Sequence, residues 1–197
     1  MGGGTDTDEA FLWQIKNANG GDFVILRASG DDAYNPWVMN MSVVSGARLN
    51  SVTTILFNNA KASAESEVLT ILRGAEAIFL AGGDQSQYLD YWVGTEVQKI
   101  LQDKLATTTI GGTSAGCMVL GNWIYSAEEG SITSEDALAN PYDKYITIVP
   151  GLLKIPYLET LLADTHFGEF AVMFSFFSCR CSFIFLYCIC IVIVVNM

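Results

Sequence analysis

Four short apolar segments recur along the first 110 residues, each bounded by glycine or by polar residues. They are rich in β-branched or aliphatic side chains and do not alternate between apolar and polar positions. Strands that are buried on both faces show this continuous pattern, which is typical of a parallel sheet covered by helices. We therefore predict strands at residues 23–26, 51–57, 77–81 and 106–110.

Longer segments that can form helices separate these strands, at residues 8–19, 62–73 and 87–105. Strands that alternate with helices predict an α/β fold with a mostly parallel sheet and helices on both of its faces. In such sheets the functional groups gather at the carboxyl ends of the strands. Those ends carry the polar or glycine-containing segments 29–31, 82–85 and 112–116.

The segment after the fourth strand reads Gly-Thr-Ser-Ala-Gly and is followed by a stretch, 115–120, that can begin a helix. This is the Gly-x-Ser-x-Gly pattern of a nucleophile elbow, in which a sharp strand-to-helix turn exposes the serine hydroxyl. Small neighbours suit a strained and crowded backbone. The amide of Ala115 would then point at the oxyanion that forms when Ser114 attacks a carbonyl. An ordinary glycine-rich turn would give the same five residues.

A serine hydroxyl needs a base within hydrogen-bond reach to act as a nucleophile. The chain has one histidine, His166, so a Ser-His pair would have to join it to Ser114. A carboxylate would complete a triad by orienting the imidazole. The residues alone leave that carboxylate open among several acids between the two: Glu128, Glu129, Glu135, Asp136 and Asp143.

The turn after the third strand, Gly-Gly-Asp-Gln at 82–85, is the second candidate for chemistry. Two glycines allow the backbone to approach a substrate, and an exposed amide there could be the second oxyanion donor. Gln85 could bind a substrate amide or carboxylate, or it could face water at the start of a helix.

Length and charge narrow the function classes. The 197 residues suit one domain, and the net charge of −11 comes with no basic patch, so we expect no nucleic-acid partner. The main body has one cysteine, Cys117, and therefore no disulfide framework. The start of the chain lacks the basic and apolar regions of a secretory signal.

The composition changes near residue 168. Residues 170–195 are almost wholly apolar and long enough to span a bilayer. We consider two interpretations, a membrane anchor and a tail that is not the natural end of the protein. The predicted organisation is an α/β domain at 1–167 and an apolar tail at 168–197. We expect a cytoplasmic protein, or one that is associated with a membrane through this tail.

Three ordered motifs, at 79–85, 112–116 and 164–167, together resemble the cyanophycinase-like serine peptidases, relatives of the aspartyl dipeptidases of peptidase E type. The segments 2–6, 27–30 and 137–144 resemble the same family, so the resemblance covers about residues 2–167. It implies a three-layer αβα fold like that of class I glutamine amidotransferases. The family places a strand ahead of segment 2–6 and a helix after segment 164–167, and we expect the fold to lack both.

The resemblance also implies roles for the site residues. Ser114 would be the nucleophile and His166 the base, and the amides of Gly83 and Ala115 would form the oxyanion hole. Gln85, with Asp84 beside it, would bind substrate. For the triad acid the resemblance favours Glu135, with Glu129 as the alternative because it lies fifteen residues after the serine.

The expected function is a serine-type peptidase that cuts peptide or β-Asp-linked isopeptide bonds, without a metal or other cofactor. The substrate would be a peptide, with aspartate or arginine as candidate constituents, and a homodimer is one arrangement that we consider. The alternative is a catalytically impaired, truncated or membrane-tethered relative. An α/β-hydrolase esterase would share the elbow but normally has more chain between its acid and histidine.

Overall fold

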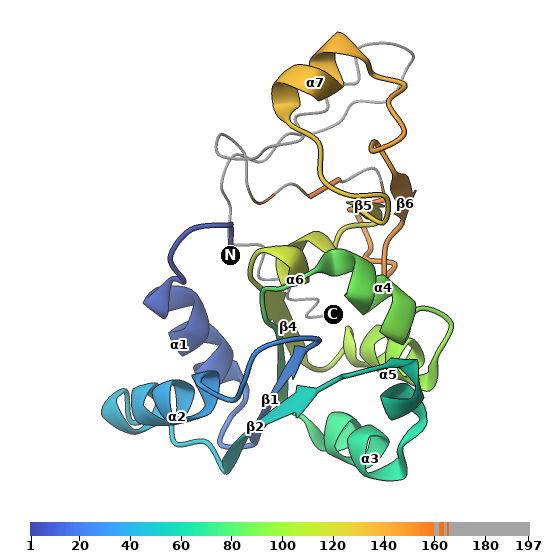
Figure 1. The fold of residues 1–197 in the computed structure, drawn as a ribbon. Helices are drawn as coiled ribbons and strands as arrows, with labels where there is room; N and C mark the ends of the chain where they lie inside the picture. The colour runs from blue at the N-terminus through green and yellow to red at the C-terminus, as the bar shows by residue number, and fades with distance from the viewer. Residues whose placement is uncertain (160–161, 164, 166–197) are drawn as a thin grey trace.

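The computed structural model describes residues 1–159, 162–163 and 165, and their core is a parallel sheet of four strands (Figure 1). The strand order is β2-β1-β3-β4, and every neighbouring pair is parallel. The predicted αβα architecture is confirmed. The strands are β1 (Asp22–Arg27), β2 (Ser51–Leu56), β3 (Ala77–Leu80) and β4 (Thr109–Gly112).

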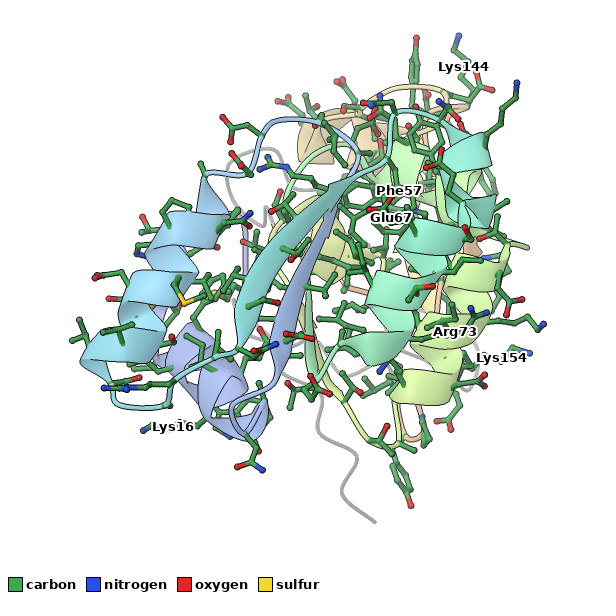
Figure 2. All side chains as sticks on the ribbon, turned by 90° about the horizontal axis from the view of Figure 1, so that it is seen from below. Lys16, Phe57, Glu67, Arg73, Lys144 and Lys154 are labelled. Atoms are coloured by element: carbon green, nitrogen blue, oxygen red, sulfur yellow. The ribbon has the colours of Figure 1, made fainter. Side chains whose placement is uncertain are left out.

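Helices cover both faces of this sheet (Figure 2). One face packs against α1 (Asp8–Asn17) and α2 (Tyr34–Val44), through a core that includes Phe11, Phe23 and Phe79. The other face packs against a larger group of helices, with Leu26, Ile78 and Leu80 in its core. That group comprises α3 (Ser66–Gly74), α4 (Gln85–Trp92), α5 (Glu96–Lys104) and α6 (Ala115–Met118), and a short 3₁₀ helix, η1 (Ala60–Ala64), precedes α3.

Successive residues of the central strands point to opposite faces of the sheet. In β3, Ile78 and Leu80 belong to one core, and Ala77 and Phe79 belong to the other. Both cores are apolar, which explains why the sequence shows continuous hydrophobic runs and no alternation.

After α6 the chain leaves the sheet and forms a separate segment beyond the carboxyl ends of the strands (Figure 1). It contains β5 (Trp123–Tyr125), α7 (Ser134–Ala139) and β6 (Ile148–Pro150), and β5 pairs with β6 in antiparallel fashion. Its own small core consists of Tyr125, Ile132 and Ala137. We call residues 123–150 the β5–β6 segment.

Some predicted boundaries were wrong, and the sequence analysis did not predict α2 or any element of the β5–β6 segment. The fourth strand begins at Thr109 and not at 106, because Thr107 and Thr108 donate hydrogen bonds to the Lys104 carbonyl and close the end of α5. The helix expected at 87–105 is two helices, interrupted at Gly94, whose φ of +73° favours glycine. The helix expected at 62–73 is the 3₁₀ helix followed by α3.

The apolar tail predicted at 168–197 lies outside the described residues. Within the described part of the chain, none of the helices combines the length and apolar character needed to cross a membrane. The same residues contain no group of three or more histidine, cysteine or acidic side chains arranged to hold a metal ion.

Candidate active site

Three loops that follow parallel strands meet at the carboxyl-end edge of the sheet. A Cβ atom added to Gly82, after β3, would lie 3.3 Å from the Cβ of Ser114, after β4. A Cβ atom added to Gly83 would lie 3.3 Å from the Oγ of Ser29, after β1. The topology therefore brings two of the sequence motifs, 82–85 and 112–116, into direct contact.

Ser114 occupies the point where β4 ends and α6 begins. Its backbone has φ +50° and ψ −126°, a conformation that a residue with a side chain adopts at a cost of about 1–3 kcal/mol. From Thr108 to Gly121 every residue is buried except Ser114, which is partly exposed. The local fold thus places one hydroxyl at the surface of an otherwise buried turn.

The two glycines that flank this serine permit close backbone packing. A Cβ on Gly116 would lie 2.1 Å from the carbonyl oxygen of Leu80, so α6 rests directly on the end of β3. A Cβ on Gly112 would lie 2.5 Å from the carbonyl oxygen of Gly116. Both positions are restricted to glycine by backbone atoms, which have little room to move.

The first three residues of the chain hold the serine turn from the other side. The N–H of Ser114 and the hydroxyl of Thr113 both donate to the carbonyl of Gly2, each over 3.2 Å. The terminal ammonium of Met1 donates to the Gly112 carbonyl over 2.5 Å. The N–H of Gly3 donates to the carbonyl of Thr165 over 2.6 Å. Residues 2 and 3 therefore bridge the serine turn and the segment that leads to His166.

Two backbone amides at this edge lack an acceptor among the described residues. Within the described residues, the N–H groups of Gly83 and Ala115 donate no hydrogen bond. Gly83 is exposed and has φ +156°, whereas Ala115 is buried as the first residue of α6. The N-terminus of a helix adds positive potential at such a position, which suits the binding of an anion.

Tyr88 fixes the turn that carries one of these amides. Its hydroxyl donates to the carbonyls of Ala81 (2.7 Å) and Gly82 (3.0 Å) from α4. Burial raises the pKa of Tyr88 to about 12, outweighing the lowering by a hydrogen bond with the backbone of Ala28. The hydroxyl therefore stays protonated at neutral pH and keeps donating. Sequence analysis missed this residue, and its position three residues after Gln85, on one face of α4, was the available signal.

The motif 82–85 divides its polar side chains between two environments. Asp84 is the N-cap of α4, where its Oδ1 accepts hydrogen bonds from the N–H and the hydroxyl of Ser86, over 2.9 Å and 2.7 Å. Gln85 is buried, and its amide donates to the carbonyl of Tyr125 over 3.3 Å. That bond ties the start of α4 to the β5–β6 segment.

The two candidate acids both lie in the β5–β6 segment and are exposed. Glu129 lies in the turn between Ala127 and Gly130, and Glu135 is the second residue of α7. The hydrogen bonds of the described residues connect neither carboxylate to Ser114. His166 itself lies outside the described residues.

Comparison with known proteins places this geometry in a family. Residues 29–141, more than half of the chain, match the model of peptidase family S51. A crystal structure of a peptidase from an acI-B1 Actinobacterium superposes with a TM-score of 0.52 at 16% sequence identity, and the match covers 77% of this chain. The chain spans 62% of the length of that structure, and at this identity the likeness concerns the fold. A search of curated proteins gives no significant match. From the family match, the chain belongs to peptidase family S51.

Proposed function

We propose that this chain is a serine-type peptidase that hydrolyses peptide bonds, or β-aspartyl isopeptide bonds, through an acyl-enzyme. The observation that carries the proposal is the partly exposed Ser114, held with φ +50° between β4 and α6 in an otherwise buried stretch. A strained serine at a strand-to-helix turn is the arrangement of a nucleophile elbow. The choice of β-aspartyl bonds rests on the resemblance to cyanophycinase-like peptidases.

In this proposal the Ser114 Oγ attacks the scissile carbonyl carbon while His166 accepts the hydroxyl proton. The carbon–nitrogen bond then breaks as His166 gives that proton to the leaving amine, and water later hydrolyses the serine ester. The hydrogen bonds of Gly2 and Gly3 support this pairing. They link Ser114 to Thr165, the neighbour of His166, across one peptide group, so the Thr165 carbonyl oxygen lies within about 8 Å of the Ser114 nitrogen.

The amides of Gly83 and Ala115 would bind the oxyanion of the tetrahedral intermediate. Their support is the contact between Gly82 and Ser114 and the absence of other acceptors for these amides within the described residues. Removal of one such donor typically costs about 100-fold or more in turnover. Asp84 and Gln85, which directly follow Gly83 at the start of α4, would bind substrate, as the family resemblance implies. Glu135, or alternatively Glu129, would orient the histidine.

Covalent labelling of the full chain tests this function. We expect a fluorophosphonate probe to add once to the wild-type protein, as measured by intact mass, and not to the Ser114→Ala variant. Ser66→Ala is the matched control, because Ser66 is exposed at the start of α3 and should leave labelling unchanged. The proposal fails if the wild type is not labelled or if Ser114→Ala is labelled equally.

A further inference from the structure

A second polar feature lies close to the serine turn, in the loop formed by residues 1–7. The loop begins at the serine turn, because Gly2 accepts the N–H of Ser114. It folds back on itself, because the N–H of Thr7 lies 3.1 Å from the sulfur of the buried Met1. Asp6 belongs to this loop, and three residues lie between it and Gly2, so its Cα lies within about 14 Å of the Gly2 Cα.

The two carboxylate oxygens of Asp6 differ in their surroundings. Oδ2 accepts a hydrogen bond from the hydroxyl of Tyr34 over 2.5 Å. Oδ1 is buried and has no hydrogen-bond partner among the residues that the structure describes. A buried polar atom without a partner is unfavourable, and more so when the group is charged, so it calls for an explanation.

Tyr34 holds the carboxylate in a fixed orientation. Its ring packs against Phe11 and Phe79, with centroid separations of 5.9 Å and 5.6 Å. Burial, followed by the hydrogen bond that the hydroxyl donates to Asp6, holds the pKa of Tyr34 above its usual value. The phenol therefore stays protonated and donates to Oδ2, so within the described part of the chain Oδ1 is the carboxylate oxygen without a donor.

The cation nearest to Tyr34 is engaged elsewhere. Arg27 lies 6.0 Å from the centre of the Tyr34 ring, but its guanidinium donates to the carbonyls of Ser29 and Asp31 and approaches the Asp31 carboxylate at 4.0 Å. Among the described residues, no lysine or arginine forms a salt bridge with Asp6. The charge of Asp6 is thus left without a cation from those residues.

We propose that Asp6 forms a subsite for a cationic nitrogen of the substrate, which donates an N–H to Oδ1. The subsite rests on the proposed peptidase function, since it assigns a substrate contact to that site. A free α-ammonium group and a basic side chain share this chemistry. Either would supply a donor to Oδ1 and neutralise the carboxylate.

Binding to the catalytically inert Ser114→Ala chain tests the subsite without requiring turnover. Three dipeptide amides serve as probes: Ala-Ala-NH₂ with a free ammonium, acetyl-Ala-Arg-NH₂ with a basic side chain, and acetyl-Ala-Ala-NH₂ without charge. We expect one of the two cationic probes to bind at least 10-fold more tightly than the neutral one, as measured by calorimetry. The probe that does so identifies the source of the cation.

The Asp6→Asn substitution, added to the same chain, should abolish that preference. Asparagine retains an acceptor for Tyr34 but loses the charge, so the preference should fall below about 2-fold while the neutral probe binds as before. Asp8→Asn is the matched control, because Asp8 is exposed two residues away and removes the same charge. The preference of the Asp8→Asn variant for the cationic probe should stay within 2-fold of that of the Ser114→Ala chain.

The subsite is disproved if neither cationic probe is preferred, or if the preference survives Asp6→Asn. It is also disproved if Asp8→Asn abolishes the preference equally, since that result would indicate a general effect of charge. Fluorophosphonate labelling of the wild type reports separately on the nucleophile. If the wild type is labelled but neither cationic probe is preferred, the subsite is rejected and the peptidase function is retained. If the preference is present but the wild type is not labelled, the peptidase function is rejected and the cation site is retained.

Discussion

The serine turn and the β5–β6 segment carry the two halves of the proposed catalytic machinery, and they are held in different ways. The serine turn lies between the sheet and α6, where backbone atoms of β3 and α6 approach each other so closely that only glycine fits. The β5–β6 segment has a local core of three buried side chains, reaches the large core of the sheet through Ile124, and exposes both candidate acids.

This difference shows where positional precision comes from in the fold. Ser114 is fixed by the backbone packing of two large cores, so it cannot move without disturbing the sheet. The carboxylates depend on a small local core, on β5–β6 pairing and on contacts such as the bond from Gln85 to Tyr125. Regions with few buried contacts open at a lower free energy than the core. We therefore expect substitutions near the serine to act on stability and those in the segment to act on turnover.

Gly116→Ala should produce the largest effect. Its Cβ would lie 2.1 Å from the Leu80 carbonyl oxygen and 2.5 Å from that of Ala81, so α6 must separate from β3. We expect the free energy of unfolding to fall by about 4 kcal/mol or more, or the chain not to fold, as measured by urea denaturation.

Gly74→Ala is the matched control for that substitution. A Cβ at Gly74 meets nothing within 4 Å at the end of α3, so alanine should be neutral or stabilise by up to about 1 kcal/mol. A small loss in Gly116→Ala, similar to the control, would contradict the rigid serine turn and weaken the comparison.

The sequence predicts the sheet well because its signal is local. The four buried runs, their order in βα units and the three loop motifs are all visible as continuous apolar segments and glycine clusters. The β5–β6 segment was missed because its strands have three residues each. Its core also depends on contacts between positions that are not adjacent in the sequence, such as Tyr125 and Ala137. Elements this short leave no period to detect.

For the site, the sequence predicts candidate residues but not the contacts that hold them in place. The Gly-x-Ser-x-Gly pattern locates Ser114, whereas nothing in the pattern indicates that Gly2 accepts its N–H or that Tyr88 holds the carbonyls of Ala81 and Gly82. The prediction that Asp84 and Gln85 bind substrate stays a prediction. The hydrogen bond between Gly2 and Ser114 joins residues more than a hundred positions apart, so it follows from the folded topology and has no local signature.

The second prediction concerns the acid on the β5–β6 segment. Glu135→Gln should reduce turnover of a peptide substrate by about 100-fold or more, because the amide cannot stabilise an imidazolium, while the free energy of unfolding changes by less than about 0.5 kcal/mol. Glu129→Gln should leave turnover within about 3-fold if Glu135 is the acid, and the two results should exchange if Glu129 is. Turnover is measured under saturating substrate, and unfolding by urea.

Glu67→Gln provides the control for a carboxylate at the same helical position. Glu67 is the second residue of α3 and Glu135 is the second residue of α7, and both side chains are exposed. Figure 2 labels Glu67 among the helices that cover one face of the sheet. Both substitutions remove a charge from the first turn of a helix, so their effects on stability should match. Unchanged turnover in both Glu135→Gln and Glu129→Gln would place the triad acid outside the β5–β6 segment. The segment would then carry no part of the catalytic machinery.

The smallest effects should come from the two tyrosines that bond to the backbone of each region. Tyr88→Phe removes this donor from the carbonyls of the buried Ala81 and the partly buried Gly82 and should cost about 2 kcal/mol. Tyr125→Phe removes one bond to the Gly130 carbonyl and should cost about 1 kcal/mol or less, because water can reach that group more easily. Only Tyr88→Phe should also slow fluorophosphonate labelling, since it loosens the turn that carries the Gly83 amide. Equal costs, or slower labelling in Tyr125→Phe alone, would mean that the β5–β6 segment and not the sheet edge governs the reactivity of the serine.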